Sequence, residues 1–164
     1  MNILVLCTGN SARSILLESI LNRDQPDLGI RAFSAGSDPA GRVHPAALKL
    51  LRAKGYPTDG LKSQSWDDYA AREGPPLDVV ITVCDNAAAE TCPLWPHRGE
   101  HGPVQTHWGI PDPAAAPEDE WDEAFDAAYQ TLQARAQRLF NLPDIAHGGP
   151  GPNLKAQLDA IGKH

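Results

Sequence analysis

The sequence has few cysteines, no long apolar run and no excess of positive charge. Its 164 residues include three cysteines, an odd number without the spacing of a small disulfide-stapled domain. The formal net charge of -7 argues against nucleic acid and anionic membrane surfaces as partners. No stretch is long enough to span a bilayer, and the apolar run beginning at Ile3 is too short for a signal peptide. These features predict a cytoplasmic protein with reduced thiols and one main domain.

The most informative segment follows the apolar residues 3–6 directly. It consists of Cys7, Thr8, Gly9, Asn10, Ser11, Ala12, Arg13 and Ser14. Small residues between a strand and a helix bend the backbone into a cup whose amides bind an oxyanion. The Arg13 guanidinium can hold two anion oxygens, and its charge favours a thiolate at Cys7. We interpret residues 8–14 as an oxyanion-binding loop and Cys7 as a nucleophile.

Apolar runs alternate with amphipathic stretches along the chain. The pattern predicts strands at residues 3–6, 30–34, 77–83 and 104–108, and helices at 14–23, 45–54, 66–72 and 118–140. This alternation is typical of an α/β fold, a three-layer open parallel four-stranded sheet with helices on both faces. Ligands of such sheets lie beyond the carboxyl ends of the strands.

The segment after residue 140 differs in composition, so we divide the chain into a domain at residues 1–140 and a Gly/Pro-rich tail at 141–164. Within the tail, residues 153–161 are compatible with a short helix that has Leu154, Leu158 and Ile161 on one side. Packing on the same domain and packing on a neighbouring subunit both remain open.

The other two cysteines, Cys84 and Cys92, stand at the two ends of a predicted loop. Cys84 ends the strongest predicted strand, which places it at the same sheet edge as Cys7. Inert thiols are one interpretation, and zinc bound with His97, His101 and His107 is another, although close cysteine pairs are missing. A third interpretation is a relay in which Cys84 attacks the Cys7 sulfur and Cys92 then takes over Cys84. The relay predicts that residues 85–91 rearrange between redox states.

Asp112 lies between Pro111 and Pro113, after the last predicted strand. An aspartate before a proline is usually a turn residue. An oxyanion mechanism, however, needs a proton donor for the departing oxygen. By sequence order Asp112 is the best-placed candidate for this acid.

These segments resemble the arsenate reductases that share the low-molecular-weight protein tyrosine phosphatase fold, over about residues 1–140. The resemblance rests on residues 7–14, 34–36, 80–92 and 107–113, in that order. It implies that Cys7 attacks arsenate within the 8–14 loop, that Ser14 hydrogen-bonds the Cys7 thiolate, and that Asp112 is the acid. It further implies a relay through Cys84 and Cys92 that thioredoxin resets, with phosphate and sulfate as further oxyanion ligands.

The first motif alone fits phosphatases of the same fold, so phosphomonoester hydrolysis by Cys7, Arg13 and Asp112 is the alternative function. The Cys84/Cys92 pair and the His-Trp-Gly sequence at 107–109 favour the reductases. The phosphatases usually carry tyrosines after the Asp-Pro pair, where this chain has Ala114 and Ala115. A non-catalytic anion- or metal-binding regulator is a third possibility.

The chain departs from its relatives at several positions. The spacing from Cys84 to Cys92 is one residue longer than in the best-known thioredoxin-coupled members, which leaves a glutathione/glutaredoxin donor open. Ala12 stands where many relatives have a further cysteine. Some members bind potassium, and Asn10, Glu18 and Ser34 match three ligand positions, whereas Ser65 replaces the expected acidic fourth ligand. No tightly bound cofactor is expected.

Overall fold

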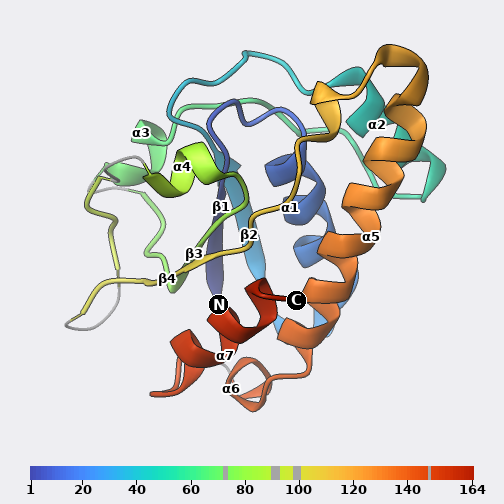
Figure 1. The fold of residues 1–164 in the computed structure, drawn as a ribbon. Helices are drawn as coiled ribbons and strands as arrows, with labels where there is room; N and C mark the ends of the chain where they lie inside the picture. Colours follow the sequence, from blue (N-terminus) through green and yellow to red (C-terminus); the bar gives the residue numbers. More distant parts are fainter. Residues whose placement is uncertain (72–73, 90–92, 98–100, 148) are drawn as a thin grey trace.

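A four-stranded parallel sheet forms the centre of the protein (Figure 1). The structure is a computed structural model that describes residues 1–164 except 72–73, 90–92, 98–100 and 148. The strands are β1 (Asn2–Leu6), β2 (Arg31–Ala35), β3 (Val79–Thr82) and β4 (Val104–His107). Their order is β2-β1-β3-β4, and every neighbouring pair is parallel. The predicted strand at 77–83 is shorter in the structure because Leu77 forms only an isolated bridge with His97.

Seven helices connect and follow the strands in the described part of the chain. They are α1 (Arg13–Arg23), α2 (Pro45–Ala53), α3 (Asp67–Ala70), α4 (Asp85–Ala89), α5 (Trp121–Phe140), α6 (Pro143–Ala146) and α7 (Leu154–Gly162). Short 3-10 turns lie at Pro26–Leu28, Pro113–Ala115 and Glu118–Glu120. Within these described segments, no helix is both long and apolar enough to cross a membrane.

The segment after Cys84 corrects the sequence prediction, which treated it as a loop. Residues Asp85–Ala89 form the short helix α4. Three successive alanines explain this, because alanine has the highest intrinsic helix propensity. The helix predicted at 118–140 also differs, since its first three residues form a 3-10 turn and α5 begins at Trp121.

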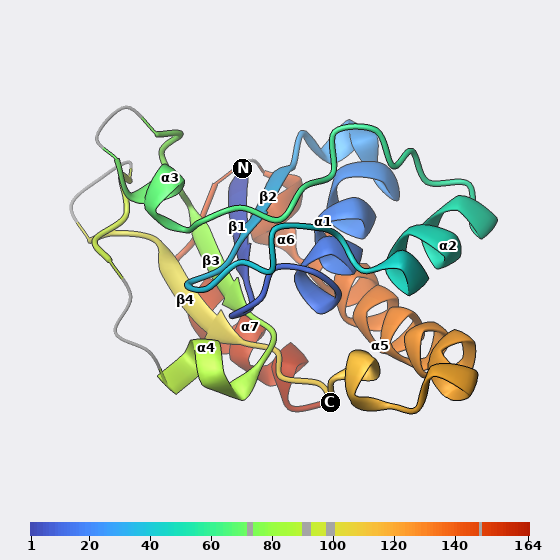
Figure 2. The same ribbon diagram turned by 90° about the horizontal axis from the view of Figure 1, so that it is seen from above.

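The sheet is covered on both faces, which gives the three layers expected, but the two covers are unequal. Ile3 and Val5 of β1 face the larger core cluster, which contains residues of α1, α2, α5 and α7. Leu4 and Leu6 face a smaller cluster with Trp66, beside α3, and Trp95. Figure 2 shows α1, α2 and α5 on one side of the sheet and α3 on the other.

The C-terminal segment packs on the same domain. Its helix α7 buries Leu154, Leu158 and Ile161, the three residues predicted to share one face. These side chains belong to the larger core cluster, together with residues of β1, β3 and α5. The helix predicted at 153–161 therefore packs on the domain of its own chain.

The strand register brings the carboxyl ends of the sheet into line. Leu6 pairs with Ala35 and with Thr82, and Thr82 pairs with His107. The segments that follow these positions begin at one sheet edge, where α/β proteins place their ligands. These segments contain the sequence-predicted site residues.

Candidate active site

The loop after β1 holds its carbonyl groups outward. The Thr8 carbonyl accepts a hydrogen bond from the Asp38 amide (3.0 Å), and the Gly9 carbonyl accepts one from the Ala40 amide (2.9 Å). The Ser11 carbonyl accepts one from the His44 amide (2.9 Å). In a trans peptide the N–H points opposite to the preceding carbonyl, so the amides of Gly9 and Ala12 are directed inward, whereas the Asn10 amide donates to the Cys7 carbonyl (3.2 Å). The loop therefore has the polarity of an anion-binding cup.

Two backbone positions allow the loop to close on itself. Asn10 has φ of 44°, in the left-handed region where asparagine is one of the better-tolerated residues. Its buried side chain donates to the Ser14 hydroxyl (2.9 Å) and accepts from the Gln64 amide (2.9 Å). At Gly36 a Cβ atom would lie 2.3 Å from the Thr8 carbonyl oxygen, so only glycine lets the end of β2 pass the loop.

The first turn of α1 continues the cup. Its N-cap is Ala12, and no side chain caps the first helical amides. Uncapped amides at a helix N-terminus are hydrogen-bond donors for an anion. The N-terminal end of this eleven-residue helix, directly after the loop, therefore adds to the positive potential of the cup.

One nitrogen of the Arg13 guanidinium group fixes the side chain, and other nitrogens can donate to a ligand. One terminal nitrogen, Nη1, donates to the Ile110 carbonyl (2.9 Å), and Nη2 lies 3.7 Å from the Asp112 carboxylate. The Nε atom is buried and has no hydrogen-bond partner among the described residues. A buried N–H without an acceptor is costly, so Nε is a donor available to a bound oxyanion.

These residues enclose a cavity of about 120 Å³. It is lined by Cys7, Gly9, Asn10, Ser11, Ala12, Arg13, His44, Asp112 and Ala114. Cys7 is at its base, at the end of β1, and Asp112 and Ala114 come from the segment after β4. The cavity is small and lined by donors, as expected for a tetrahedral oxyanion.

Cys7 and Cys84 form a hydrogen-bonded pair of buried thiols. The hydrogen bond with Cys84 and burial raise the pKa of Cys7, although Arg13 acts in the opposite direction. The bond from Cys7 lowers the pKa of Cys84 to about 5, and the Thr8 amide also donates to the Cys84 sulfur (3.4 Å). The sequence predicted a thiolate at Cys7. In this conformation the hydrogen bond couples the ionisation of Cys7 to that of Cys84.

Asp112 lies at the rim of the cavity beside Arg13. Its Oδ1 atom accepts from the Ala114 amide (3.0 Å), which caps the 3-10 turn at Pro113–Ala115. Its Oδ2 atom is the one nearest Arg13, and 44% of the side chain is exposed. Asp112 is thus both the turn residue expected before a proline and a carboxyl group within reach of a ligand held by Arg13.

Ser14 of the loop motif and the potassium candidates form hydrogen bonds beside the loop. The Ser14 hydroxyl accepts from Asn10, and the described residues contain no hydrogen bond between Ser14 and Cys7. Ser34 donates to the Glu18 carboxylate (2.6 Å), and burial raises the pKa of Glu18 to about 7. Ser65 accepts from the Asp67 amide. Asn10, Glu18 and Ser34 each have a side-chain oxygen, and each side chain already takes part in a hydrogen bond.

The third cysteine, Cys92, lies outside the described residues. Among the residues that are described, no three His, Cys, Asp or Glu side chains gather as a metal site would require. His107, one of the zinc candidates, contacts Thr82 (2.8 Å) and Asp85 (3.0 Å), and His97 contacts the Trp95 carbonyl.

Sequence reasoning missed two contributors to the site. One is the Ile110 carbonyl, which fixes Arg13. A backbone carbonyl cannot be recognised from the pattern of side chains in a sequence. His44 lines the cavity and contacts the rings of Trp121 (4.6 Å between centroids) and Phe125 (4.9 Å). Its position directly before Pro45 is a helix N-cap signal, and Nδ1 does accept from the Ala46 amide. Burial lowers the pKa of His44, so the neutral ring is favoured, with its proton on Nε2.

Comparison with known proteins agrees with this geometry. An arsenate reductase of Halalkalibacterium halodurans is 34% identical over 122 residues, which cover 71% of this chain and 78% of that protein. The low molecular weight protein-tyrosine-phosphatase Wzb of Salmonella typhi is 27% identical over 152 residues, or 90% and 97% of the two chains. A solved structure described as an arsenate reductase in the phosphate binding state has the same fold. Its TM-score is 0.63, with 22% identity over 84% of this chain and 95% of the other.

The family model described as low molecular weight phosphotyrosine protein phosphatase matches residues 2–147, which include Cys7, Arg13, Cys84 and Asp112. Arsenate reductases and phosphatases both occur among the relatives. The chain is an enzyme of the low molecular weight phosphotyrosine protein phosphatase family.

Proposed function

We propose that this protein reduces arsenate to arsenite, with Cys7 as the nucleophile and Cys84 as the second thiol. The observation that supports this most is the hydrogen bond between Cys7, which lines the anion cavity, and Cys84. Hydrolysis of a phosphomonoester by this chemistry requires one thiol, whereas reduction of an oxyanion requires two electrons from two thiols. The 34% identical relative, itself an arsenate reductase, supports the same assignment.

In the first step the loop amides and Arg13 bind arsenate above Cys7. The proton of Cys7 moves along the existing hydrogen bond to Cys84 as the Cys7 sulfur attacks arsenic. The hydroxyl group of arsenate leaves as water after it receives a proton from Asp112. The product is a covalent Cys7–arsenic(V) adduct in which no electrons have yet been transferred.

The second step transfers two electrons. Cys84 releases its proton to solvent, and the donor bond from the Thr8 amide (3.4 Å) stabilises the resulting thiolate. This thiolate attacks the Cys7 sulfur and forms a disulfide. The sulfur–arsenic bond breaks, and its electron pair stays on arsenic, which leaves as arsenite. Arsenic is reduced from +5 to +3, and two thiols are oxidised.

The third step restores Cys7. We propose that Cys92 attacks Cys84, so that the disulfide passes to Cys84–Cys92 and Cys7 is freed. A dithiol donor then reduces this disulfide, with thioredoxin as the first candidate and glutathione/glutaredoxin as the second. This scheme requires a reducing compartment, as expected in the cytoplasm.

The proposal is tested by measuring arsenate-dependent NADPH consumption with thioredoxin and thioredoxin reductase, and in parallel with glutathione and glutaredoxin. We expect Cys84→Ala to lower the reductase rate at least about a hundredfold, because the second electron source is lost. Cys92→Ala should allow a single turnover with thioredoxin and leave Cys7–Cys84 oxidised. Repeated turnover of Cys92→Ala at the wild-type rate would rule out the three-thiol relay.

Phosphomonoester hydrolysis is the second candidate, because Cys7, Arg13 and Asp112 have the geometry that it needs. The phosphatase that is 27% identical and aligned over 90% of this chain supports this second candidate function. Hydrolysis of an aryl phosphate distinguishes the two functions, since a phosphatase does not use Cys84. If Cys84→Ala retains the hydrolysis rate and the wild type shows no arsenate-dependent thiol oxidation, the protein is a phosphatase.

A further inference from the structure

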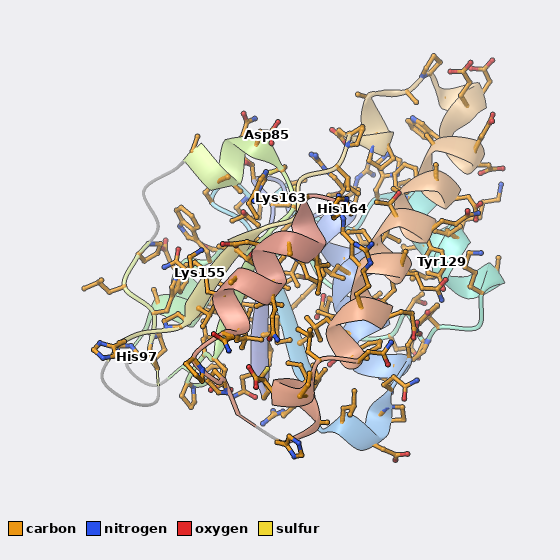
Figure 3. All side chains as sticks on the ribbon, turned by 60° about the horizontal axis from the view of Figure 1, so that its bottom comes forward. Asp85, His97, Tyr129, Lys155, Lys163 and His164 are labelled. Carbon is orange, nitrogen blue, oxygen red and sulfur yellow. The ribbon has the colours of Figure 1, made fainter. Side chains whose placement is uncertain are left out.

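The C-terminal helix α7 contacts the segment that carries the proposed acid. The family match ends at residue 147, whereas α7 begins at Leu154. Figure 3 shows α7 in front of the sheet, with Lys155 near one end and Lys163 near the other. The segment from His107 to Asp112 continues from β4, the strand that α7 contacts.

The contact centres on Trp108, whose side chain is 0% exposed. Its indole N–H donates to the Leu158 carbonyl (3.0 Å), a bond between two buried groups. A Cβ atom at Gly162 would lie 2.4 Å from the His107 carbonyl oxygen and 2.7 Å from Cδ1 of Trp108. The end of α7 therefore touches residues 107 and 108 with no space for a methyl group.

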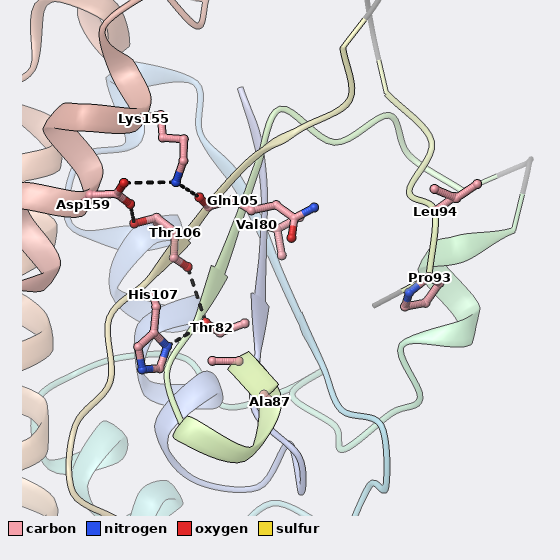
Figure 4. Close-up of a pocket in the computed structure, with 11 residues that line it drawn as sticks. Val80, Thr82, Ala87, Pro93, Leu94, Gln105, Thr106, His107, Lys155 and Asp159 are labelled. Atoms are coloured by element: carbon pink, nitrogen blue, oxygen red, sulfur yellow. Dashed lines mark hydrogen bonds and ion pairs between the residues drawn. The ribbon is translucent and has the colours of Figure 1, made fainter. Parts of the chain in front are cut away.

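Polar side chains extend the contact along β4 (Figure 4). The Thr106 hydroxyl donates to Asp159 (2.7 Å), and Lys155 donates to the Gln105 carbonyl (2.9 Å). Lys155 also pairs with Asp159 (3.0 Å). The bond from Thr106 lowers the pKa of Asp159, so the carboxylate form that makes these contacts is favoured. The helix is thus attached to β4 through Lys155 and Asp159, which lie one turn apart on the same side of α7.

From Trp108 the contacts lead directly to the anion site. Arg135 of α5 donates to the Trp108 carbonyl (2.8 Å), and the Ile110 amide donates to the Val83 carbonyl (3.3 Å). The Ile110 carbonyl then accepts from Arg13, and Asp112 lies two residues further along. The segment is therefore held by α5 and α7 on one side and by Arg13 on the other.

We propose that α7 is a positioning element for catalysis, which through Gly162, Leu158 and Trp108 fixes the segment that aligns Arg13 and Asp112. This inference rests on the proposed function, because that function assigns Asp112 as the acid. A helix outside the family match would then set the efficiency of proton donation. The residues of α7 themselves do not touch the cavity.

The test compares two Gly→Ala variants. Gly162→Ala places a methyl group against the His107 carbonyl, whereas Gly149→Ala, in the same C-terminal segment, has no atom within 4 Å of the new Cβ. The reduced protein is mixed with arsenate, and Cys7–Cys84 disulfide formation is followed by alkylation and mass spectrometry, at a temperature where each variant is fully folded. We expect Gly162→Ala to slow this first turnover about tenfold and Gly149→Ala to match the wild type.

A double-mutant cycle separates positioning from general destabilisation. If α7 acts through the acid, Gly162→Ala should cost little further rate when Asp112→Asn is already present. An equal loss in both backgrounds would overturn the proposal. Trp108→Phe, which removes only the indole donor, serves as a second variant if Gly162→Ala folds poorly, and it should show the same non-additivity.

Hydrogen exchange tests the proposal independently of any reaction with arsenate. The amides of Trp108 and Ile110 are hydrogen-bonded to Thr82 and Val83. We expect Gly162→Ala to raise their exchange rates at least about tenfold, with the amides of β1 unchanged. Unchanged exchange at 108 and 110 would overturn the role of α7 whatever the wild type does with arsenate. Conversely, a wild type that forms no disulfide with arsenate contradicts the proposed function and leaves the exchange result to decide on α7.

Discussion

At the scale of single residues, Arg13 has two tasks that compete for one side chain. One terminal nitrogen is committed to the Ile110 carbonyl at 2.9 Å, while the buried Nε meets no acceptor in the part of the chain that the structure describes. A guanidinium can do both because its donors form a rigid planar fork. An ammonium group has no such fork, so a change that keeps the charge still loses one of the two tasks.

We therefore expect Arg13→Lys to lower kcat/KM for arsenate at least about a hundredfold, because the lysine cannot hold Ile110 and the anion together. The measurement is the initial rate over a range of arsenate concentrations, with phosphate affinity from calorimetry alongside. Arg31→Lys, an exposed site on β2, provides the matched control and should leave both quantities unchanged. Retention of more than about a tenth of the activity in Arg13→Lys would mean that charge alone is sufficient.

The sequence located Cys7, Arg13 and Asp112 because side-chain type and spacing carry their chemistry. It could not locate the Ile110 carbonyl, since every residue has a carbonyl and only the tertiary fold selects this one. It could not reveal that the ionisation of Cys7 is coupled to that of Cys84, because the hydrogen bond between them joins residues far apart in the chain. Pairwise contacts of this kind do not leave a local pattern.

At the scale of elements, α4 is the segment that the proposed relay must change. It follows Cys84 directly, and the Ala88 amide donates to the Cys84 carbonyl (3.2 Å). Asp85, the first residue of α4, contacts His107 of β4. Because the aspartate is 96% exposed, this pair adds little stability. The core contact of α4 is the small side chain of Ala87, so a short helix with one turn of hydrogen bonds opens at low cost.

We expect Ala88→Gly to accelerate transfer of the disulfide from Cys7–Cys84 to Cys84–Cys92 by up to about fivefold, since glycine weakens a helix by about 1 kcal/mol. The first step with arsenate should keep its rate. Rapid-quench alkylation followed by peptide mapping measures the two disulfides separately. Ala134→Gly weakens α5 at an exposed position and serves as the control. If Ala88→Gly leaves the transfer rate unchanged, opening of α4 does not limit the relay.

The strands and long helices were predictable because their hydrophobic periodicity is strong. The residues at which they begin and end were less predictable. The loop predicted after Cys84 is a helix because the alanine run has helical propensity without the apolar periodicity that would reveal it. The place of α7 was not predictable, because Leu154, Leu158 and Ile161 suit burial against any apolar surface. The fit of Gly162 against residues 107 and 108, together with the hydrogen bonds of Leu158, Asp159 and Lys155, determines which surface it is.

At the scale of the whole molecule, the protein is negative but contains a partly buried carboxyl group that favours neutrality. Glu18 forms no salt bridge within the part of the chain that is described. Burial raises its pKa from 4.5 to about 7, and the bond from Ser34 opposes this shift. Between these two values the folded state keeps a proton that the unfolded state has released. The contribution of Glu18 to stability therefore falls as the pH rises from 4.5 to about 7 and stays constant above it.

Replacing Glu18 by glutamine should remove this pH dependence. Relative to the wild type, we expect Glu18→Gln to gain up to about 3 kcal/mol of unfolding free energy between pH 4.5 and pH 8, because one pKa unit corresponds to about 1.4 kcal/mol. Urea unfolding at both pH values in a tetramethylammonium buffer measures the difference, and Glu123→Gln on the exposed side of α5 is the control. Parallel pH profiles for the wild type and Glu18→Gln would contradict the assignment. If Glu18 holds potassium, replacing the buffer cation by potassium at pH 8 should restore stability to the wild type and not to Glu18→Gln, since only the carboxylate offers the cation a charge.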